Sequence, residues 1–385
     1  MFDKPEHNNL FIAFSITVLI CIGVSSVAPV LPTISRHFQI DHVKASLLIT
    51  FFTLPGIVFL PIAGFLTDRY GRKVVLLSCL ISFAIAGTAC SQATEFHHLL
   101  MLRVIQGLSA APFGMLSSTI IGDTFRGAEL GRVVGYNTTI LNIGLALAPG
   151  IGGNLALIHW KFVFIIPALA LLTAFTAVKA PLGKPKETLP PKIYFTKFLE
   201  VLRHKKTMLL LSLGFFNLLM VFGPLLICLP LLLDAKYQAS SAQIGYIMGT
   251  LAISAAIAGT VTGRLLAVNS PQKLLLIGQS CVVLAMFLIP LTPYLWLHFL
   301  PVLLLGIGNG MSATSVMSTV IVQAPMGQRA SLMSVYGVSL CLAQTLGPLF
   351  FGGIAKFGGV NIPFFVASCI AVLMGTITFL FNWDR

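Results

Sequence analysis

The sequence predicts an all-α membrane protein with twelve transmembrane helices in two pseudo-symmetric six-helix bundles. Of its 385 residues, 57% are hydrophobic and 9% are charged, and the mean hydropathy is +0.95. Soluble domains are roughly half apolar and about a quarter charged. Apolar runs of about 20 residues recur along the chain, and each is long enough to cross a bilayer as a helix. The short alternating segments typical of a membrane β-barrel do not occur in the sequence.

The apolar runs define the predicted helices in chain order. The spans are residues 10–33, 45–66, 74–93, 98–121, 133–156, 160–180, 207–232, 241–263, 273–292, 295–322, 330–354 and 362–382. The seven cysteines all fall within these spans, and we interpret them as packing residues. Neither a metal site nor a cofactor is therefore predicted.

Lys and Arg residues are distributed unevenly between the two sides of the predicted spans. With a cytoplasmic N-terminus, the cytoplasmic segments hold 18 of the 24, the outer loops hold five, and Arg103 lies within a span. The outer five are Arg36, Lys44, Lys161, Lys236 and Lys356. By the positive-inside rule this bias predicts that both termini are cytoplasmic. The net charge of +13 then reflects topology, and no nucleic-acid partner is expected.

The longest predicted connection divides the chain into two halves. We expect an N-terminal six-helix bundle at residues 1–180, a cytoplasmic linker at 181–206 and a C-terminal six-helix bundle at 207–385. Four prolines at the start of the linker end the sixth helix. Apolar residues then alternate with basic ones; they are Ile193, Phe198, Leu199, Val201 and Leu202. This pattern favours an amphipathic helix at the membrane surface, and a simple basic linker is the alternative.

Short segments of the first half recur in the second half, at offsets of 195 to 203 residues. The matched pairs are IAGFLTDR (62–69) with IAGTVTGR (257–264), GLSA (107–110) with GMSA (310–313), and APGIGG (148–153) with GPLFFGG (347–353). Two parallel six-helix repeats with a central site between them are a typical layout of secondary transporters.

The connection between the second and third spans, GFLTDRYGRK, is rich in charge and in glycine. It resembles the signature that the major facilitator superfamily carries in this loop. The matching residues are Gly64, Asp68, Arg69, Gly71, Arg72 and Lys73. The resemblance implies that Asp68 closes a cytoplasmic gate and that Arg72 pairs with Asp123 at the end of the fourth span. The second half has Gly263 in place of Asp68, so we expect a one-sided gate. A plain positive-inside loop would require neither the glycines nor the Asp.

The fourth and fifth spans carry two further elements of this resemblance. Arg103, Gln106 and Gly107 are similar to the superfamily's Arg-x-x-Gln-Gly element. The fifth span resembles the signature of the 12-helix drug:proton antiporters, with Ala148 in place of a usual Gly. Its matching residues are Gly135, Gly144, Ala148, Pro149, Gly152 and Gly153. The resemblance implies the major facilitator fold, a location in the bacterial inner (cytoplasmic) membrane, and export.

The fifth span also has a physical interpretation. Gly144, Ala148 and Gly152 are spaced by four, so they form a smooth stripe that lets a neighbouring helix approach closely. Pro149 removes a backbone hydrogen bond and allows the helix to bend. We interpret the stripe as a close, bendable contact between the two halves. Ordinary small-residue packing would explain the stripe but not the full spacing of the motif.

Polar residues within spans are the candidates for a substrate cavity. Arg103 is the only ionisable residue well inside a span, where a charge is costly. It either serves an anionic substrate or a proton relay, or it has a structural role with helix carbonyls or Gln106, and its sequence context favours neither. The other candidates are Gln106, Ser25, Asn142, Asn217, Asn309, Tyr336 and Gln344. Asn142 lies about 200° around the helix from Gly144, so we expect it to face away from the small-residue stripe.

The eleven acidic residues all fall in loops or at the ends of spans, so a buried carboxylate does not support proton coupling. His298 is either a titrating group or an interfacial anchor. The leading hypothesis is a monomeric exporter of amphipathic small molecules, including drugs, that is driven by protons across the lipid bilayer. The alternatives are an exporter of an anionic metabolite, such as a carboxylate siderophore, and a facilitator of sugars or other neutral solutes. Neither a catalytic constellation nor an ATP-binding loop occurs in the sequence, so we do not expect an enzyme.

Overall fold

The computed structural model describes two compact units that are built from helices. The described residues are 4–180, 182, 205–323 and 329–381, and every regular element in these ranges is a helix. Unit 1 is Met1–Thr188 and unit 2 is Leu189–Arg385. The all-α fold that the sequence predicts is confirmed. The apolar residues 193–202 of the predicted linker helix lie outside the described residues, so that helix stays a prediction.

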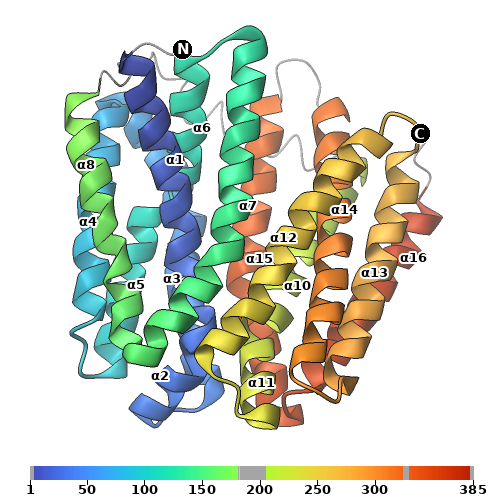
Figure 1. The fold of residues 1–385 in the computed structure, drawn as a ribbon. Helices are drawn as coiled ribbons and strands as arrows, with labels where there is room; N and C mark the ends of the chain where they lie inside the picture. The colour runs from blue at the N-terminus through green and yellow to red at the C-terminus, as the bar shows by residue number, and fades with distance from the viewer. Residues whose placement is uncertain (1–3, 181, 183–204, 324–328, 382–385) are drawn as a thin grey trace. The chain divides into compact units, whose positions relative to one another are not determined.

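Unit 1 begins with α1 and ends with α8 (Figure 1). Its α-helices are α1 Lys4–Ser25, α2 Leu31–Phe38, α3 His42–Tyr70, α4 Arg72–Cys90, α5 Phe96–Ala110, α6 Phe113–Thr124, α7 Gly127–Ile158 and α8 Ala170–Lys179. Its 3₁₀ segments are η1 Ala28–Val30, η2 Trp160–Phe164 and η3 Ile166–Leu169.

Unit 2 begins with α10 and ends with α16 (Figure 1). Its α-helices are α10 Lys205–Met220, α11 Leu229–Tyr237, α12 Ser241–Leu265, α13 Pro271–Leu291, α14 Phe299–Gln323, α15 Arg329–Gly358 and α16 Ile362–Leu380. The π-helical segment η4 Val221–Cys228 joins α10 to α11, and the 3₁₀ turn η5 Trp296–His298 precedes α14.

The helical segments follow the predicted spans in order. Within the described residues, eleven segments are long and apolar enough to cross a membrane. The remaining span, the second, is α3, which has 29 residues and an apolar stretch at Lys44–Leu60. The chain is thus a polytopic helical membrane protein.

Several predicted spans are interrupted, and proline lies at four of the interruptions. The sixth span divides into η2, η3 and α8, with Pro167 in η3. The fourth span divides into α5 and α6 beside Pro112. The seventh passes through η4, which contains Pro224. The first continues through η1 and α2, each with a proline in its first turn. Proline lacks the backbone N–H that would continue the α-helical pattern, and apolar length alone does not report these breaks.

The two units share one internal packing plan. In unit 1, α3 and α4 pack on α5, and α4 also packs on α8. In unit 2, α12 and α13 pack on α14, and α13 also packs on α16. Gln39 and Gln238 end α2 and α11 in the left-handed conformation. Asp41 and Ser240 cap the helices that follow. The two residues of each pair are 199 residues apart in the sequence. This offset defines which residue of unit 2 corresponds to which residue of unit 1, the register of the repeat.

This register differs from two of the matches made from the sequence, although Gly310 also repeats the contact of Gly107, at 203 residues, through the Ala255 carbonyl. A side chain on Gly107 would overlap the Phe52 carbonyl, and one on Gly306 would overlap the Leu251 carbonyl. These contacts also repeat at 199 residues, whereas the IAGFLTDR and GLSA matches have offsets of 195 and 203. The difference is about one helical turn, which leaves small residues on the same helix face. The counterpart of Asp68 is therefore Ala267, and Gly263 is the counterpart of Gly64.

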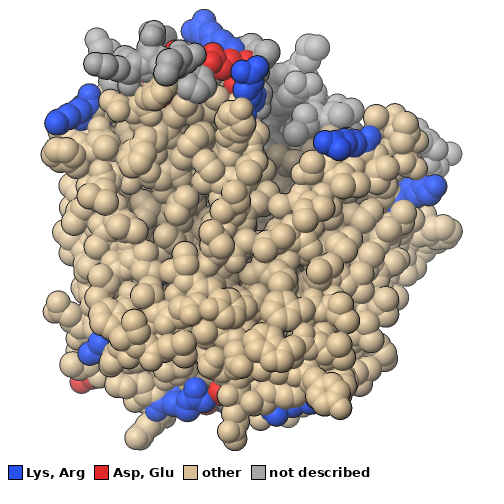
Figure 2. All heavy atoms as spheres, viewed as in Figure 1, with Lys and Arg blue, Asp and Glu red and all other residues tan. Residues whose placement is uncertain are grey.

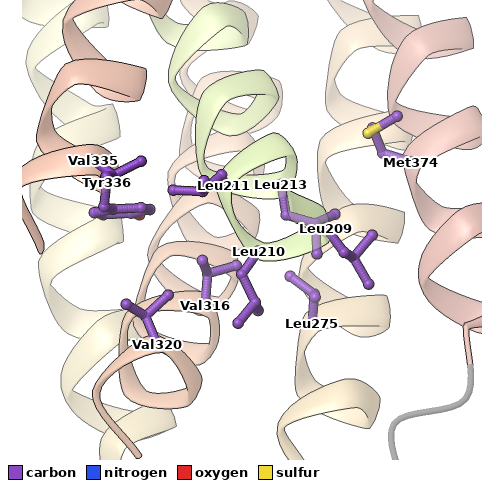
Figure 3. Packing of buried hydrophobic residues seen from close by; sticks show 10 residues of the cluster. All are labelled: Leu209, Leu210, Leu211, Leu213, Leu275, Val316, Val320, Val335, Tyr336 and Met374. Atoms are coloured by element: carbon purple, nitrogen blue, oxygen red, sulfur yellow. The ribbon is translucent and has the colours of Figure 1, made fainter. Parts of the chain in front are cut away.

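Unit 2 contains an apolar cluster around α10 (Figure 3). Its members are Leu209, Leu210, Leu211, Leu213, Leu275, Val316, Val320, Val335, Tyr336 and Met374. Three consecutive leucines of α10 are buried, so this helix is covered on more than one side. A helix that is apolar all round is typically an interior helix of a bundle.

Charged residues lie at the helix ends of each unit. On the face drawn in Figure 2, Lys, Arg, Asp and Glu gather at the two ends, and uncharged residues form the band between them. This distribution is the one that a bilayer requires, since charges within the hydrocarbon core are costly.

Candidate functional site

The turn between α3 and α4 consists of a single residue, Gly71. Its φ of 87° and ψ of 152° lie in a region that is essentially restricted to glycine. The Gly71 N–H donates to the Thr67 carbonyl at 3.1 Å, and α4 begins at the next residue. The backbone conformation of this turn therefore explains why the second glycine of the loop motif is present, because any side chain at this position would strain the turn.

Arg72 joins the start of α4 to the end of α6. Its guanidinium forms an ion pair with Asp123, and Nη1 also donates to the Thr119 carbonyl at 3.5 Å. The Arg72 side chain is buried, whereas that of Asp123 is partly exposed. A half-buried, hydrogen-bonded pair is stronger than an exposed one, because it is less screened by salt.

Lys73 and Arg69 add contacts on either side of this pair. Lys73 Nζ donates to the Ala180 carbonyl at 3.4 Å, directly after α8. The Arg69 guanidinium lies 5.5 Å from the centre of the Tyr70 ring, a modest cation–π contact. At Gly64 a side chain would meet Met115 Sδ of α6 at an ordinary distance of 3.7 Å. The side chain of Asp68 lies outside the described part of the chain, so its gating role stays a prediction.

Arg103 is fully buried and joins three helices of unit 1. Nε donates to the Leu48 carbonyl of α3 at 3.1 Å, and Nη2 donates to the Gly23 carbonyl of α1 at 3.0 Å. Nη1 donates to Gln106 Oε1 at 2.7 Å within α5.

The Phe52 ring completes the surroundings of the guanidinium, with its centre 4.3 Å away. A carbonyl oxygen has two lone pairs, so the helix carbonyls can accept from Arg103 without losing their own helical bonds. Gln106 is fully buried as well. The contacts of Arg103 correspond to its structural alternative, a role with helix carbonyls and Gln106.

The small-residue stripe of α7 packs on α1. A side chain on Gly144 would lie 2.9 Å from Cys21 Sγ, and one on Gly152 would overlap the Ser26 carbonyl. Ala148 between them is buried. The close contact therefore lies within unit 1, which corrects our interpretation of the stripe as a contact between the two halves.

The remaining positions of the fifth-span motif differ in their surroundings. Pro149 and Gly153 are buried, and Gly135 is exposed. A side chain on Gly135 would meet no described atom within 4 Å. Steric fit in this structure therefore explains Gly144 and Gly152 but not Gly135.

A hydrogen-bonded cluster in unit 1 was missed by the sequence analysis. Thr17 Oγ1 of α1 donates to Asn137 Oδ1 of α7 at 2.8 Å. Ser117 Oγ of α6 lies 3.0 Å from Thr17 Oγ1 and donates to the Ala13 carbonyl at 3.0 Å. All of these residues lie inside predicted spans, so a polar side chain within an apolar span was the sequence feature that could have indicated them. Their convergence on one point requires the packing of three helices.

Two of the predicted cavity residues pair with each other in unit 2. Asn309 Nδ2 of α14 donates to Asn217 Oδ1 of α10 at 3.0 Å. Asn217 borders a cavity of about 30 Å³, which is large enough for a water molecule. Gln279 Oε1 and Ser312 Oγ border the same cavity and, among the described residues, have no hydrogen-bond partner.

The other predicted cavity residues are dispersed. Ser25 is buried in α1, and Tyr336 belongs to the apolar cluster of unit 2. Asn142 of α7 and Gln344 of α15 are half-buried. Their assignment to a substrate cavity stays a prediction.

His298 is also fully buried rather than placed at the surface. Nδ1 lies 3.1 Å from the Tyr294 carbonyl, and the ring meets Tyr237 edge-on with 5.4 Å between centres. Among the described residues, no group of His, Cys, Asp and Glu could hold a metal ion.

Comparison with known proteins supplies the class of the protein. The model of the Major Facilitator Superfamily matches residues 13–344 and 229–385. The chain is 26% identical to the Bacillibactin exporter of Bacillus subtilis (strain 168), over 98% of this chain and 96% of that protein. It is 25% identical to the class B Tetracycline resistance protein of Escherichia coli, over 96% and 95% of the two chains.

Solved structures agree with this class. A D-xylose-proton symporter has a TM-score of 0.78 at 14% identity, over 97% of both chains. A bacterial homologue of the lysosomal transporter Spinster, inward-facing and occupied, also has a TM-score of 0.78, at 19% identity, over 98% of this chain and 97% of that chain. At such identities these structures establish the fold alone.

Fold and sequence together define a multi-pass membrane transporter. The chain belongs to the Major Facilitator Superfamily.

Proposed function

We propose that the protein exports amphipathic small molecules, including drugs, by alternating access driven by proton antiport. The fifth-span motif of α7 and the full-length similarity to two proteins named as an exporter and a resistance protein support this proposal. The protein acts in the bacterial inner membrane as a monomer, with both termini in the cytoplasm.

The contacts of Arg103 are the observation from which we choose between drug-like and anionic substrates. All three nitrogens of the guanidinium already donate to Leu48, Gly23 and Gln106, and the Phe52 ring covers it. An anionic substrate would have to enter this fully buried site and compete with these acceptors, whereas a neutral or cationic amphipathic molecule would not. This observation favours drug-like substrates over organic acids.

The second candidate is an exporter of an anionic metabolite. The Lys and Arg residues that the predicted topology places on the cytoplasmic side favour it, because their positive potential would concentrate anions at that face. In this case cations at the helix ends would attract the substrate, and Arg103 would keep its structural contacts.

Transport into inside-out membrane vesicles tests the proposal. The ligands are tetracycline, a lipophilic cation and an aromatic carboxylate, supplied with an acid-inside gradient. We expect uptake of the first two that stops when a protonophore collapses the gradient. Uptake by right-side-out vesicles under a physiological gradient would contradict export. Selective uptake of the carboxylate would favour the second candidate.

A further inference from the structure

Unit 2 carries an apolar groove on its surface, between α12 and α14. The groove has a volume of about 390 Å³, and its walls include Ile253, Ile257 and Val261 of α12 and Leu303, Ile307 and Met311 of α14. The α12 residues are strongly exposed, with Ile257 at 63%. An exposed apolar groove of this kind can accept a hydrocarbon chain.

The hydroxyl groups in the wall donate their hydrogens to carbonyls of their own helix. Thr250 Oγ1 donates to the Ile247 carbonyl at 2.7 Å, Ser254 Oγ donates to the Thr250 carbonyl at 2.9 Å, and Thr262 Oγ1 donates to the Ala258 carbonyl at 2.7 Å. Each bond lies within α12. The groove therefore presents methyl and methylene surface to its occupant, and shape rather than hydrogen bonding selects what fills it.

Arg264 stands at one end of this apolar face. It follows Ile253 and Ile257 by 11 and 7 residues, which places the three side chains within about 20° of one line along the helix. The rise from Ile253 to Arg264 is about 16 Å, close to half of the roughly 30 Å hydrocarbon core. Arg264 is exposed. A single acyl chain of one leaflet has the length to lie beside Ile253 and Ile257 with its headgroup at Arg264.

The charge around Arg264 is one-sided. From Ala235 to Trp383 the sequence contains no Asp or Glu, while it contains Lys236, Arg264, Lys273, Arg329 and Lys356. Lys273 lies in the first turn of α13, the helix after Arg264, where the N-terminal end of the helix also favours anions. The sequence therefore supplies no carboxylate within this stretch that could pair with Arg264.

Unit 1 offers an internal comparison. At the 199-residue register, Leu54, Val58 and Ile62 of α3 correspond to Ile253, Ile257 and Val261, and they too are exposed. The counterpart of Arg264 is Phe65. The two units thus present similar apolar faces. In unit 1 the cation is Arg69, which follows Val58 and Ile62 by 11 and 7 residues but is next to Asp68 in the sequence, whereas Arg264 has no acidic neighbour in the sequence.

We propose that the groove between α12 and α14 binds one anionic phospholipid, with an acyl chain along Ile253 and Ile257 and its phosphate at Arg264. Arg264 snorkels to the level of the headgroup and binds the phosphate, while Ile253 and Ile257 contact the acyl chain. This site is independent of the transport activity and requires only the fold of unit 2.

Native mass spectrometry of the purified full-length protein tests the site. The detergent-solubilised protein is titrated with phosphatidylglycerol or with phosphatidylcholine that has identical acyl chains. We expect the first phosphatidylglycerol to bind about fivefold more tightly, the gain from one basic residue near a phosphate. Arg264→Gln should bring the two affinities together. Ile257→Trp should weaken the first site for both lipids, because the indole occupies the groove.

Arg132→Gln is the matched control, since Arg132 is an exposed arginine near the start of α7 in unit 1. It should bind lipid as the wild type does, and thermal unfolding should be unchanged in all three variants, whose original side chains are exposed. An unchanged preference in Arg264→Gln would overturn the proposal. Equal losses in Arg264→Gln and Arg132→Gln would do the same, because they indicate diffuse surface attraction. Displacement of both lipids by a lipophilic cation, with no preference for phosphatidylglycerol, would instead assign the groove to substrate.

Discussion

At the scale of single residues, Arg103 shows how a charge is kept inside the membrane. Its guanidinium donates hydrogen bonds to carbonyls of α1 and α3 and to the amide oxygen of Gln106, and the Phe52 ring covers it. No carboxylate takes part in these contacts. The charge is spread over three acceptors, so Arg103 acts as a cross-link that holds α1, α3 and α5 together.

Replacement of Arg103 should therefore reduce stability before it alters ligand selectivity. We expect Arg103→Ala to lower the stability of unit 1 by about 2–4 kcal/mol, because three acceptors lose a charged donor in an apolar interior. Arg103→Lys should recover only part of this, since lysine lacks the planar fork. Thermal unfolding in detergent measures the change. Loss of affinity for acids alone, with unchanged stability, would instead assign Arg103 to anion binding.

At the scale of helices, glycines set the closest contacts. Gly107 brings α5 onto the backbone of α3, Gly152 brings α7 onto α1, and Gly306 brings α14 onto α12. In each case a Cβ atom would overlap a carbonyl oxygen of the facing helix. Such backbone-to-backbone packing is the main way in which membrane helices associate without a hydrophobic driving force between them.

Two glycines of the same α7 motif should therefore respond differently to one added methyl group. Gly152→Ala should separate α7 from α1 and lower both thermal stability and transport, whereas Gly135→Ala should leave stability unchanged. Unfolding temperature and vesicle transport of the two variants measure the difference. A Gly152→Ala protein as stable as the wild type would show that the α1–α7 contact is looser than we infer.

The clamp at the α3–α4 turn can be tested through the ion pair of Arg72 and Asp123. Arg72→Ala should abolish transport while membrane insertion remains normal, because α4 loses its tie to α6. The exchange Arg72→Asp with Asp123→Arg should restore part of the activity if the charge pair itself matters.

Asp68→Asn should also abolish transport. The reason is separate from the ion pair, because we propose that Asp68 closes the cytoplasmic gate. Transport assays with expression-matched membranes measure both effects. Wild-type rates in Asp68→Asn would exclude the gating role of that residue.

At the scale of the whole molecule, charge sets the orientation in the bilayer. The chain has 24 Lys and Arg against 11 Asp and Glu, and unit 2 has no acid between Ala235 and Trp383. Positive charge is retained on the cytoplasmic side during insertion, which favours one topology strongly.

We accordingly expect both termini to face the cytoplasm. A fluorescent protein fused after Arg385 should fold and emit, and alkaline phosphatase fused at the same place should be inactive. Fusions within the connection between α13 and α14 should give the opposite result. Active phosphatase at the C-terminus would refute the predicted orientation.

The sequence by itself determined the features that depend on local composition. Apolar length placed the membrane spans, and charge at their ends predicted the topology. The loop signature GFLTDRYGRK supplied Gly71, whose unusual φ and ψ only glycine adopts readily. These features depend on residues that are close together in the sequence.

Only the tertiary structure decided which faces meet. It placed the α7 stripe on α1 rather than against the other half, joined Arg103 to carbonyls 55 and 80 residues away, and paired Asn217 with Asn309. It also moved the repeat register by one turn. The physical reason is that helix periodicity specifies a face but not its partner. In lipid, where every outward face is apolar, the choice of partner depends on close fit between backbones far apart in the chain.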